Sequence, residues 1–81
     1  MDVYLEKDEE NADRCVYAFG AGPDALVGRV AVDKASGDVE IVSLDEEADP
    51  PGEQFYLARV VPKLHALHDA QTYPDAERWA V

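Results

Sequence analysis

The chain has 81 residues, 47% of them hydrophobic, so it can form one small hydrophobic core and is too short for two. Its 18 Asp and Glu residues outnumber 7 Lys and Arg residues, which gives a formal net charge of −11. A surface of that sign repels phosphates, which argues against direct binding to nucleic acid or an anionic membrane and favours a basic partner. Acidic composition also accompanies general solubility and adaptation to salt, so the charge alone assigns no function.

The cysteine content and the N-terminal segment indicate a cellular compartment. Cys15 is the only cysteine, so the disulfide framework of a small secreted protein cannot form. The N-terminal segment lacks the basic and apolar regions of a signal peptide, and no apolar run approaches the roughly 20 residues that span a bilayer. We therefore expect a cytoplasmic protein that is not inserted in a membrane.

Two segments in the first quarter of the chain alternate apolar and polar residues with the two-residue period of a half-buried strand. The first strand is predicted near residues 2–7, where Val3 and Leu5 share a face, and the second near residues 14–19. The acidic run between them, residues 8–13, has no apolar pattern. It is predicted to be a solvated turn.

A hairpin is the strongest local signal, with strands predicted near residues 28–33 and 38–44. Between them, Asp33 can accept hydrogen bonds from the turn backbone and Gly37 can adopt a positive φ. The alternation of ligands and the distal glutamate of a calcium loop are both missing from this turn. The predicted role of these residues is therefore to close the hairpin.

The glycine-rich stretch before this hairpin resembles a nucleotide-binding fingerprint only in its spacing. Gly20, Gly22 and Ala25 stand at the offsets of that motif. The motif needs a following helix whose N-terminal amides hold the pyrophosphate, whereas a strand is predicted here. We expect no cofactor.

A helix is predicted near residues 53–70, with Asp49 as its N-cap and a proline in its first turn. Pro62 lacks a backbone donor, so it is predicted to kink or divide the helix near Val61. The apolar residues recur at the three-and-four spacing of one helix face. They are Leu57, Val60, Val61, Leu64 and Leu67.

These elements predict one α+β domain over residues 1–81, with a small two-layer architecture: a four-stranded antiparallel sheet and one Pro-kinked helix on one face. Residues 71–81 are predicted to be a C-terminal tail, with a short turn and with Trp79 packed back on the domain. The residues predicted to face the helix are Val3, Leu5, Cys15, Tyr17, Phe19, Val30, Val32, Val39 and Ile41.

The opposite face of the predicted sheet mixes apolar with charged residues. Tyr4, Val16, Ala31 and Val42 lie there among Asp, Glu and Arg side chains. A mixed face of this kind suits contact with a partner or with a second copy of the chain, and a core this small gains stability from dimerisation. These four residues are candidates for partner binding.

The two histidines of the chain, His65 and His68, lie three residues apart beside Asp69 near the end of the predicted helix. A metal site needs three or four converging ligands, and on a helix His68 turns towards the apolar face while Asp69 turns away from it. A protonated histidine in the last turn also favours the helix dipole. We expect structural roles, with metal binding by these three residues as the weaker alternative.

Two acidic clusters remain, in residues 8–13 and 45–53. Carboxylates there could contact a basic partner, as in an inhibitor that imitates nucleic acid. In a simple meander the two clusters lie at opposite ends of the sheet. The candidate contacts are Glu9, Glu10, Glu46 and Glu47.

No catalytic motif is present, because Ser36 and Ser43 lie in a turn and at a strand end and Cys15 is predicted to be buried. The sequence therefore favours a non-catalytic protein that acts through protein–protein interaction. One alternative is an acidic inhibitor or immunity-type protein that binds a basic nuclease or DNA-binding protein. Another is a small enzyme or metal-binding protein that uses His65 and His68.

Overall fold

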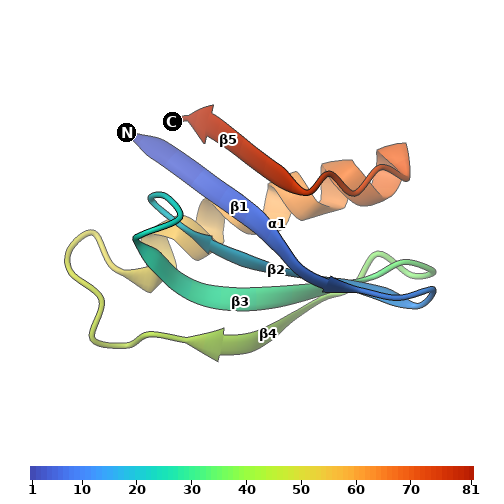
Figure 1. Cartoon of the computed structure of the whole chain (residues 1–81), viewed down its shortest axis with the longest axis horizontal. Helices are drawn as coiled ribbons and strands as arrows, with labels where there is room; N and C mark the ends of the chain where they lie inside the picture. Colours follow the sequence, from blue (N-terminus) through green and yellow to red (C-terminus); the bar gives the residue numbers. More distant parts are fainter.

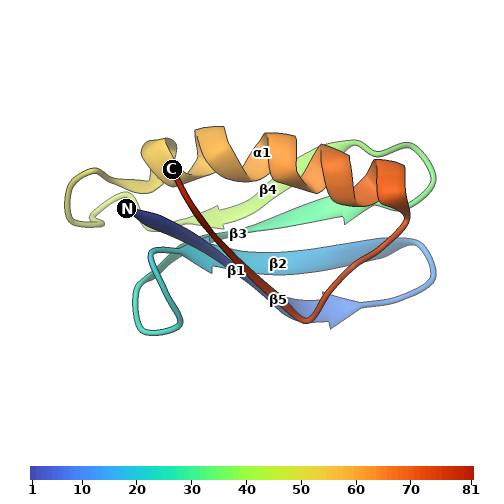
Figure 2. The same cartoon turned by 90° about the horizontal axis from the view of Figure 1, so that it is seen from above.

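The computed structural model describes residues 1–81 and has two layers, an antiparallel sheet of five strands and one helix across one face (Figures 1 and 2). The strand order is β4-β3-β2-β1-β5. No helix has the length and apolar character needed to cross a membrane. The elements in chain order are β1 (Asp2–Glu10), β2 (Arg14–Gly20), β3 (Leu26–Asp33), β4 (Val39–Leu44), α1 (Glu53–Ala70) and β5 (Ala76–Ala80).

The expected α+β architecture is confirmed, but the prediction of four strands is wrong. The first four strands form a meander, α1 then carries the chain back across the sheet, and β5 pairs with the free edge of β1. Trp79 pairs with Val3 and packs against the core, as its large apolar surface suggests. The segment predicted as a tail with a short turn is therefore an edge strand.

Strand β1 is longer than predicted, because it continues through the first acidic residues to Glu10. Glu9 pairs with Val16 and Glu10 with Cys15, and a bulge between Lys7 and Glu9 leaves Asp8 as the extra residue. The prediction of a solvated turn beginning at residue 8 is wrong. The charged side chains are accommodated in this strand because basic residues of neighbouring segments pair with them, as described below.

Helix α1 is continuous through Pro62, so the prediction of a helix kinked or divided near Val61 is wrong. Pro62 removes the hydrogen bond to the carbonyl of Ala58, and both residues are exposed, so water can solvate that carbonyl. The N-cap is Gly52, and no side chain caps the helix, which corrects the predicted role of Asp49.

The core lies between α1 and one face of the sheet. The buried helix residues are Tyr56, Val60, Leu64 and Leu67, so the apolar stripe is rotated from the predicted one, and Leu57 and Val61 are only half-buried. Ile41 remains 49% exposed although it pairs with Val30, because β4 is an edge strand. Its predicted burial is wrong. The core residues contributed by the sheet are Val3, Leu5, Cys15, Tyr17, Phe19, Val30 and Val32.

Candidate partner-binding surface

The sheet has two ends of different construction (Figure 1). At one, which we call the hairpin end, the β1–β2 turn (residues 11–13) and the β3–β4 turn (residues 34–38) lie together, and the amide of Lys34 donates to the carbonyl of Asp13 at 2.9 Å. At the other, which we call the loop end, are the β2–β3 loop (residues 21–25) and the β4–α1 loop (residues 45–52). Because β1 to β4 are in sequential order, the two acidic clusters lie at opposite ends of the sheet, as the meander predicts.

Glu9 and Glu10, the two candidate contacts at the hairpin end, are paired with basic residues of the chain. Glu10 accepts hydrogen bonds from Lys7 and from Lys34, each at 2.7 Å. Hydrogen bonds from Lys34 and then from Lys7 hold the pKa of the Glu10 carboxyl below its ordinary value. Arg14 lies 3.7 Å from Glu9. The carboxylates predicted as partner contacts at this end are therefore already engaged.

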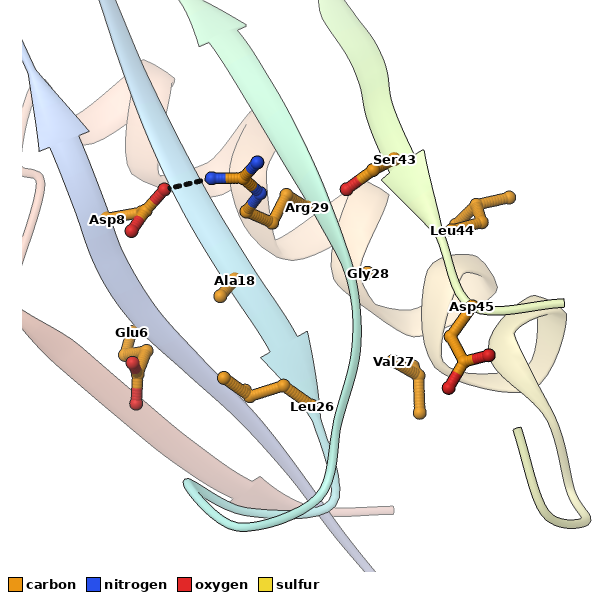
Figure 3. Close-up of a pocket in the computed structure, with 10 residues that line it drawn as sticks. All are labelled: Glu6, Asp8, Ala18, Leu26, Val27, Gly28, Arg29, Ser43, Leu44 and Asp45. Carbon is orange, nitrogen blue, oxygen red and sulfur yellow. Dashed lines mark hydrogen bonds and ion pairs between the residues drawn. The ribbon is translucent and has the colours of Figure 1, made fainter. Parts of the chain in front are cut away.

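The remaining basic residues are also occupied. Arg29 pairs with Asp8 at 2.6 Å across the helix-free face of the sheet (Figure 3). Two further pairs join β5 to its neighbours, Lys63 with Glu77 and Arg78 with Asp2, each at 3.8 Å. Arg59 alone has no acidic partner; its guanidinium stacks over Phe55 at 3.7 Å from the ring centroid and donates to the Phe55 carbonyl. None of the seven basic residues pairs with a carboxylate of the β2–β3 loop or the β4–α1 loop.

Carboxylates at the loop end make no ion pairs. All but Glu53 are exposed, and Glu53 lies in the first turn of α1, where a negative charge favours the helix dipole. This end therefore carries a negative charge that the chain itself does not balance. The residues are Asp24, Asp45, Glu46, Glu47, Asp49 and Glu53.

Two shallow hollows adjoin this charge. One, of about 380 Å³, lies on the helix-free face and contains the Arg29–Asp8 pair, with Ser43 on the β4 side (Figure 3). The other, of about 360 Å³, lies between the two loops of the loop end. Leu26, Val27 and Asp45 line both hollows, so the two form one continuous surface around the start of β3.

The histidines lie elsewhere. His65 is exposed, and the side chain of Asp69 is 85% exposed with its Oδ1 3.8 Å from Nδ1 of His68. The His68 ring packs against Gly37 so closely that a Cβ added there would lie 2.7 Å from Nδ1. No group of three His, Cys, Asp or Glu side chains in the structure could hold a metal ion. His68 therefore contributes to the packing of α1 against the β3–β4 turn.

The candidates on the sheet face do not form one apolar patch. Val16 and Ala31 are 2% and 4% exposed, although no second layer covers them. Tyr4 is half-buried, with its hydroxyl donating to Glu6 at 3.1 Å and the Arg78 guanidinium 5.2 Å from its ring. Val42 is 42% exposed on edge strand β4. Of the eight predicted contacts, Glu46 and Glu47 belong to the loop end.

Three residues of the loop end were not among the predicted contacts: Asp24, Leu26 and Tyr56. Asp24 follows the glycine and proline of the β2–β3 loop, where a turn signal conceals its proximity to Asp45. Leu26 is 36% exposed because its partner in β2 is Gly20, which has no side chain to cover it. Tyr56 stands four residues before Val60, so the helical period could have placed it on the buried face.

Comparisons of the chain with protein-family models, with curated proteins and with solved structures find no match. A proposal for its function therefore depends on its own charges and hollows.

Proposed function

We propose that this chain is a non-catalytic cytoplasmic protein that acts by binding a basic protein, and that the loop end is its contact surface. One observation carries the proposal: every Lys and Arg except Arg59 is paired with a carboxylate, and none of these carboxylates belongs to the β2–β3 loop or the β4–α1 loop. The unbalanced charge of the loop end adds to a net charge of −11. Such a field attracts basic partners and accelerates their association.

An acidic inhibitor of a basic nuclease or DNA-binding protein is the specific form of this proposal. The carboxylates of Glu46, Glu47 and Asp49 follow one another closely in an exposed loop. A protein that binds phosphates carries clustered Lys and Arg, which carboxylates can contact in place of phosphates. Occupying those cations would prevent the partner from binding nucleic acid.

The test measures how two matched charge reversals in this chain change its affinity for a partner isolated from the native host. The variant Glu46→Lys/Glu47→Lys changes the loop end, and Asp13→Lys/Asp38→Lys makes the same charge change at the hairpin end, on side chains without an ion pair. We expect the first pair to weaken binding about tenfold or more and the second much less. Added salt should lower the affinity of the natural chain, chiefly through slower association.

The opposite result is equally clear. A partner whose affinity ignores salt and both pairs of reversals, yet falls on Tyr4→Ala or Val42→Lys, would contradict the loop end as the contact surface. The helix-free face and its β4 edge would then be the site.

Self-association through β4 is the second candidate, and it rests on a separate observation. Ile41 and Val42 are 49% and 42% exposed on this edge strand, whose outer backbone groups have no strand partner. Sedimentation at micromolar concentration should then show a dimer, and Ile41→Lys should return it to a monomer. A chain that stays monomeric at roughly millimolar concentration would exclude this association.

A further inference from the structure

The hollow between the two loops of the loop end has an apolar lining and an acidic rim. Its apolar lining includes Leu26, Pro50 and Tyr56. The carboxylates at its rim are Asp24, Asp45 and Asp49, and each comes from a loop rather than from a strand or helix. The β2–β3 and β4–α1 loops therefore bring apolar side chains and carboxylates together around one hollow. This combination suits a ligand with an apolar stem and a cationic head.

Tyr56, which lines this hollow, carries a hydroxyl without a hydrogen-bond partner. Its ring belongs to the core, lies edge-on to Phe55 at 5.3 Å, and leaves the residue only 5% exposed. Its hydroxyl makes no hydrogen bond within the chain. The hydroxyl of Tyr73 is the only fully buried side-chain polar atom without a partner, so that of Tyr56 must reach the surface. Tyr56 lines the hollow, and its hydroxyl is part of the small surface that this residue leaves exposed.

The rim carboxylates make few hydrogen bonds within the chain, so most of their oxygens are free to accept from a ligand. Asp45 accepts one backbone hydrogen bond, from Glu47 at 3.1 Å, through Oδ1, which leaves Oδ2 free. The Asp49 side chain does not cap α1, because no side chain does. Asp24 and Asp49 make no side-chain hydrogen bond. No ion pair within the chain offsets the repulsion among these three like charges.

We propose that this hollow binds an arginine side chain of the basic partner, a step that rests on the proposed function. The arginine stem would lie against Leu26 and Pro50, and the guanidinium would pair with the rim carboxylates. The Tyr56 oxygen would accept one of its N–H groups. Arginine fits better than lysine, because its planar guanidinium offers five donors to several acceptors at once and is less strongly hydrated than an ammonium group.

The first experiment titrates the isotope-labelled full chain with N-acetyl-arginine methylamide and follows the backbone amides by NMR. We expect saturable shifts confined to the non-proline residues of 21–26 and 45–50 and to residue 56, with a dissociation constant of roughly 1–10 mM, as a ligand of this size can reach. The citrulline derivative, which has the same shape and no charge, should cause none. Shifts spread over all acidic surfaces would overturn the proposal, and equal binding of the lysine derivative would overturn the assignment to arginine.

Variants then test the two groups that hold the side chain. Tyr56→Phe should weaken arginine binding about fivefold, which corresponds to one hydrogen bond, and Asp45→Asn should weaken it further. Tyr73→Phe, which removes a hydroxyl outside the hollow, is the matched control and should leave the affinity unchanged. Thermal melts of all three variants separate lost binding from lost folding. An unchanged affinity in Tyr56→Phe would overturn the role of its hydroxyl.

The same variants on the native partner distinguish this inference from the proposed function. If Glu46→Lys/Glu47→Lys weakens binding of the partner but Tyr56→Phe and Asp45→Asn do not, the hollow is not the arginine site. The proposal of an acidic contact surface then stands. If none of these variants matters, both proposals fail.

Discussion

The hairpin end and the loop end are both acidic, yet only at the hairpin end do acidic loop and strand residues form ion pairs with basic ones. There, Lys7 and Lys34 hold Glu10 between them, and the Arg14 guanidinium lies near Glu9. At the loop end the carboxylates form no ion pair within the chain. The comparison teaches that composition reports how much charge a chain carries, whereas the ion pairs decide which part of it is available to a partner.

The two ends also differ in how firmly they are fixed. At the hairpin end His68 packs against Gly37, and the Lys34 ammonium lies 5.2 Å from the Tyr73 ring. The Tyr17 hydroxyl, on a fully buried side chain, donates to the Pro74 carbonyl at 2.7 Å and so ties β2 to the segment that leads into β5. No side chain of the β2–β3 loop or the β4–α1 loop makes a hydrogen bond or ion pair to another element; Asp45 accepts only from Glu47 in its own loop. The hairpin end is thus the more firmly fixed of the two, in line with the proposal that the loop end is a contact surface.

The largest expected effect comes from substituting the two glycines with positive φ, one at each end. Gly37 has φ 82° and Gly52 has φ 88°. A Cβ at Gly37 would also collide with His68, whereas a Cβ at Gly52 would meet nothing within 4 Å. We expect Gly37→Ala to cost about 2–3 kcal/mol of unfolding free energy and Gly52→Ala about 1 kcal/mol, measured by urea denaturation.

A double variant isolates the collision in that comparison. Adding His68→Ala to Gly37→Ala should recover the steric part of the loss and leave the cost of the positive φ. Equal losses in Gly37→Ala and Gly52→Ala would show that the two ends are fixed to the same degree, contrary to the contrast drawn above.

Charge reversal is the next effect in size and should have opposite signs at the two ends. Glu10→Lys would break both ion pairs and place three ammonium groups together, so the melting temperature should fall by several degrees. Glu46→Lys removes repulsion from an unpaired cluster, so its melting temperature should stay constant or rise slightly. Salt should stabilise the natural chain more than Glu46→Lys. A fall of the same size in both variants would contradict the assignment of a structural role to one end only.

The smallest expected effect is a loss of stability in acid that comes from carboxyls of the hairpin end. The pKa of Glu10 is lowered by Lys34 and Lys7, and that of Asp33 by backbone hydrogen bonds from Ser36 and Ala35. A carboxyl with a lowered folded-state pKa contributes stability that is full above its unfolded-state pKa and is lost as pH falls towards the folded value. When the pH is lowered from about 5 to about 3, the free energy of unfolding, measured by urea denaturation, should therefore fall more in the natural chain than in Glu10→Gln.

The control for the acid series is Glu46→Gln, which should reproduce the pH dependence of the natural chain closely, with any difference in the direction of relieved repulsion. If Glu10→Gln and the natural chain lose the same stability over this range, the Lys7–Glu10–Lys34 arrangement does not contribute to the fold.

Local patterns account for much of the fold. The turn between β3 and β4 forms as predicted: Asp33 accepts from the amides of Ala35 and Ser36 at 2.9 Å, and Gly37 adopts a positive φ. The helix also occupies the predicted span, because its apolar spacing extends over several turns. Strand β5 escaped prediction because five residues with one large apolar side chain give little periodic signal, and its partner β1 lies at the other end of the chain.

The candidate surface was predictable only in part. Glu46 and Glu47 were identified because they stand in an acidic loop, where charge is visible from composition. The convergence of Asp24, Asp45 and Tyr56 on one hollow depends on two loops and a helix separated along the chain. Their proximity is a long-range contact, for which no local spacing exists.

By itself the sequence determined the strand and helix periods, the hairpin turn and the net charge, because each depends on residues within a few positions or on a sum over the chain. The tertiary structure alone decided that α1 returns the chain to the free edge of β1 and that the basic residues pair with carboxylates outside the β2–β3 and β4–α1 loops. Both depend on distances between residues remote in sequence, and the attraction between two charges falls with distance and is screened beyond about 10 Å at 0.1 M salt. Which carboxylates remain free is therefore a property of the folded chain.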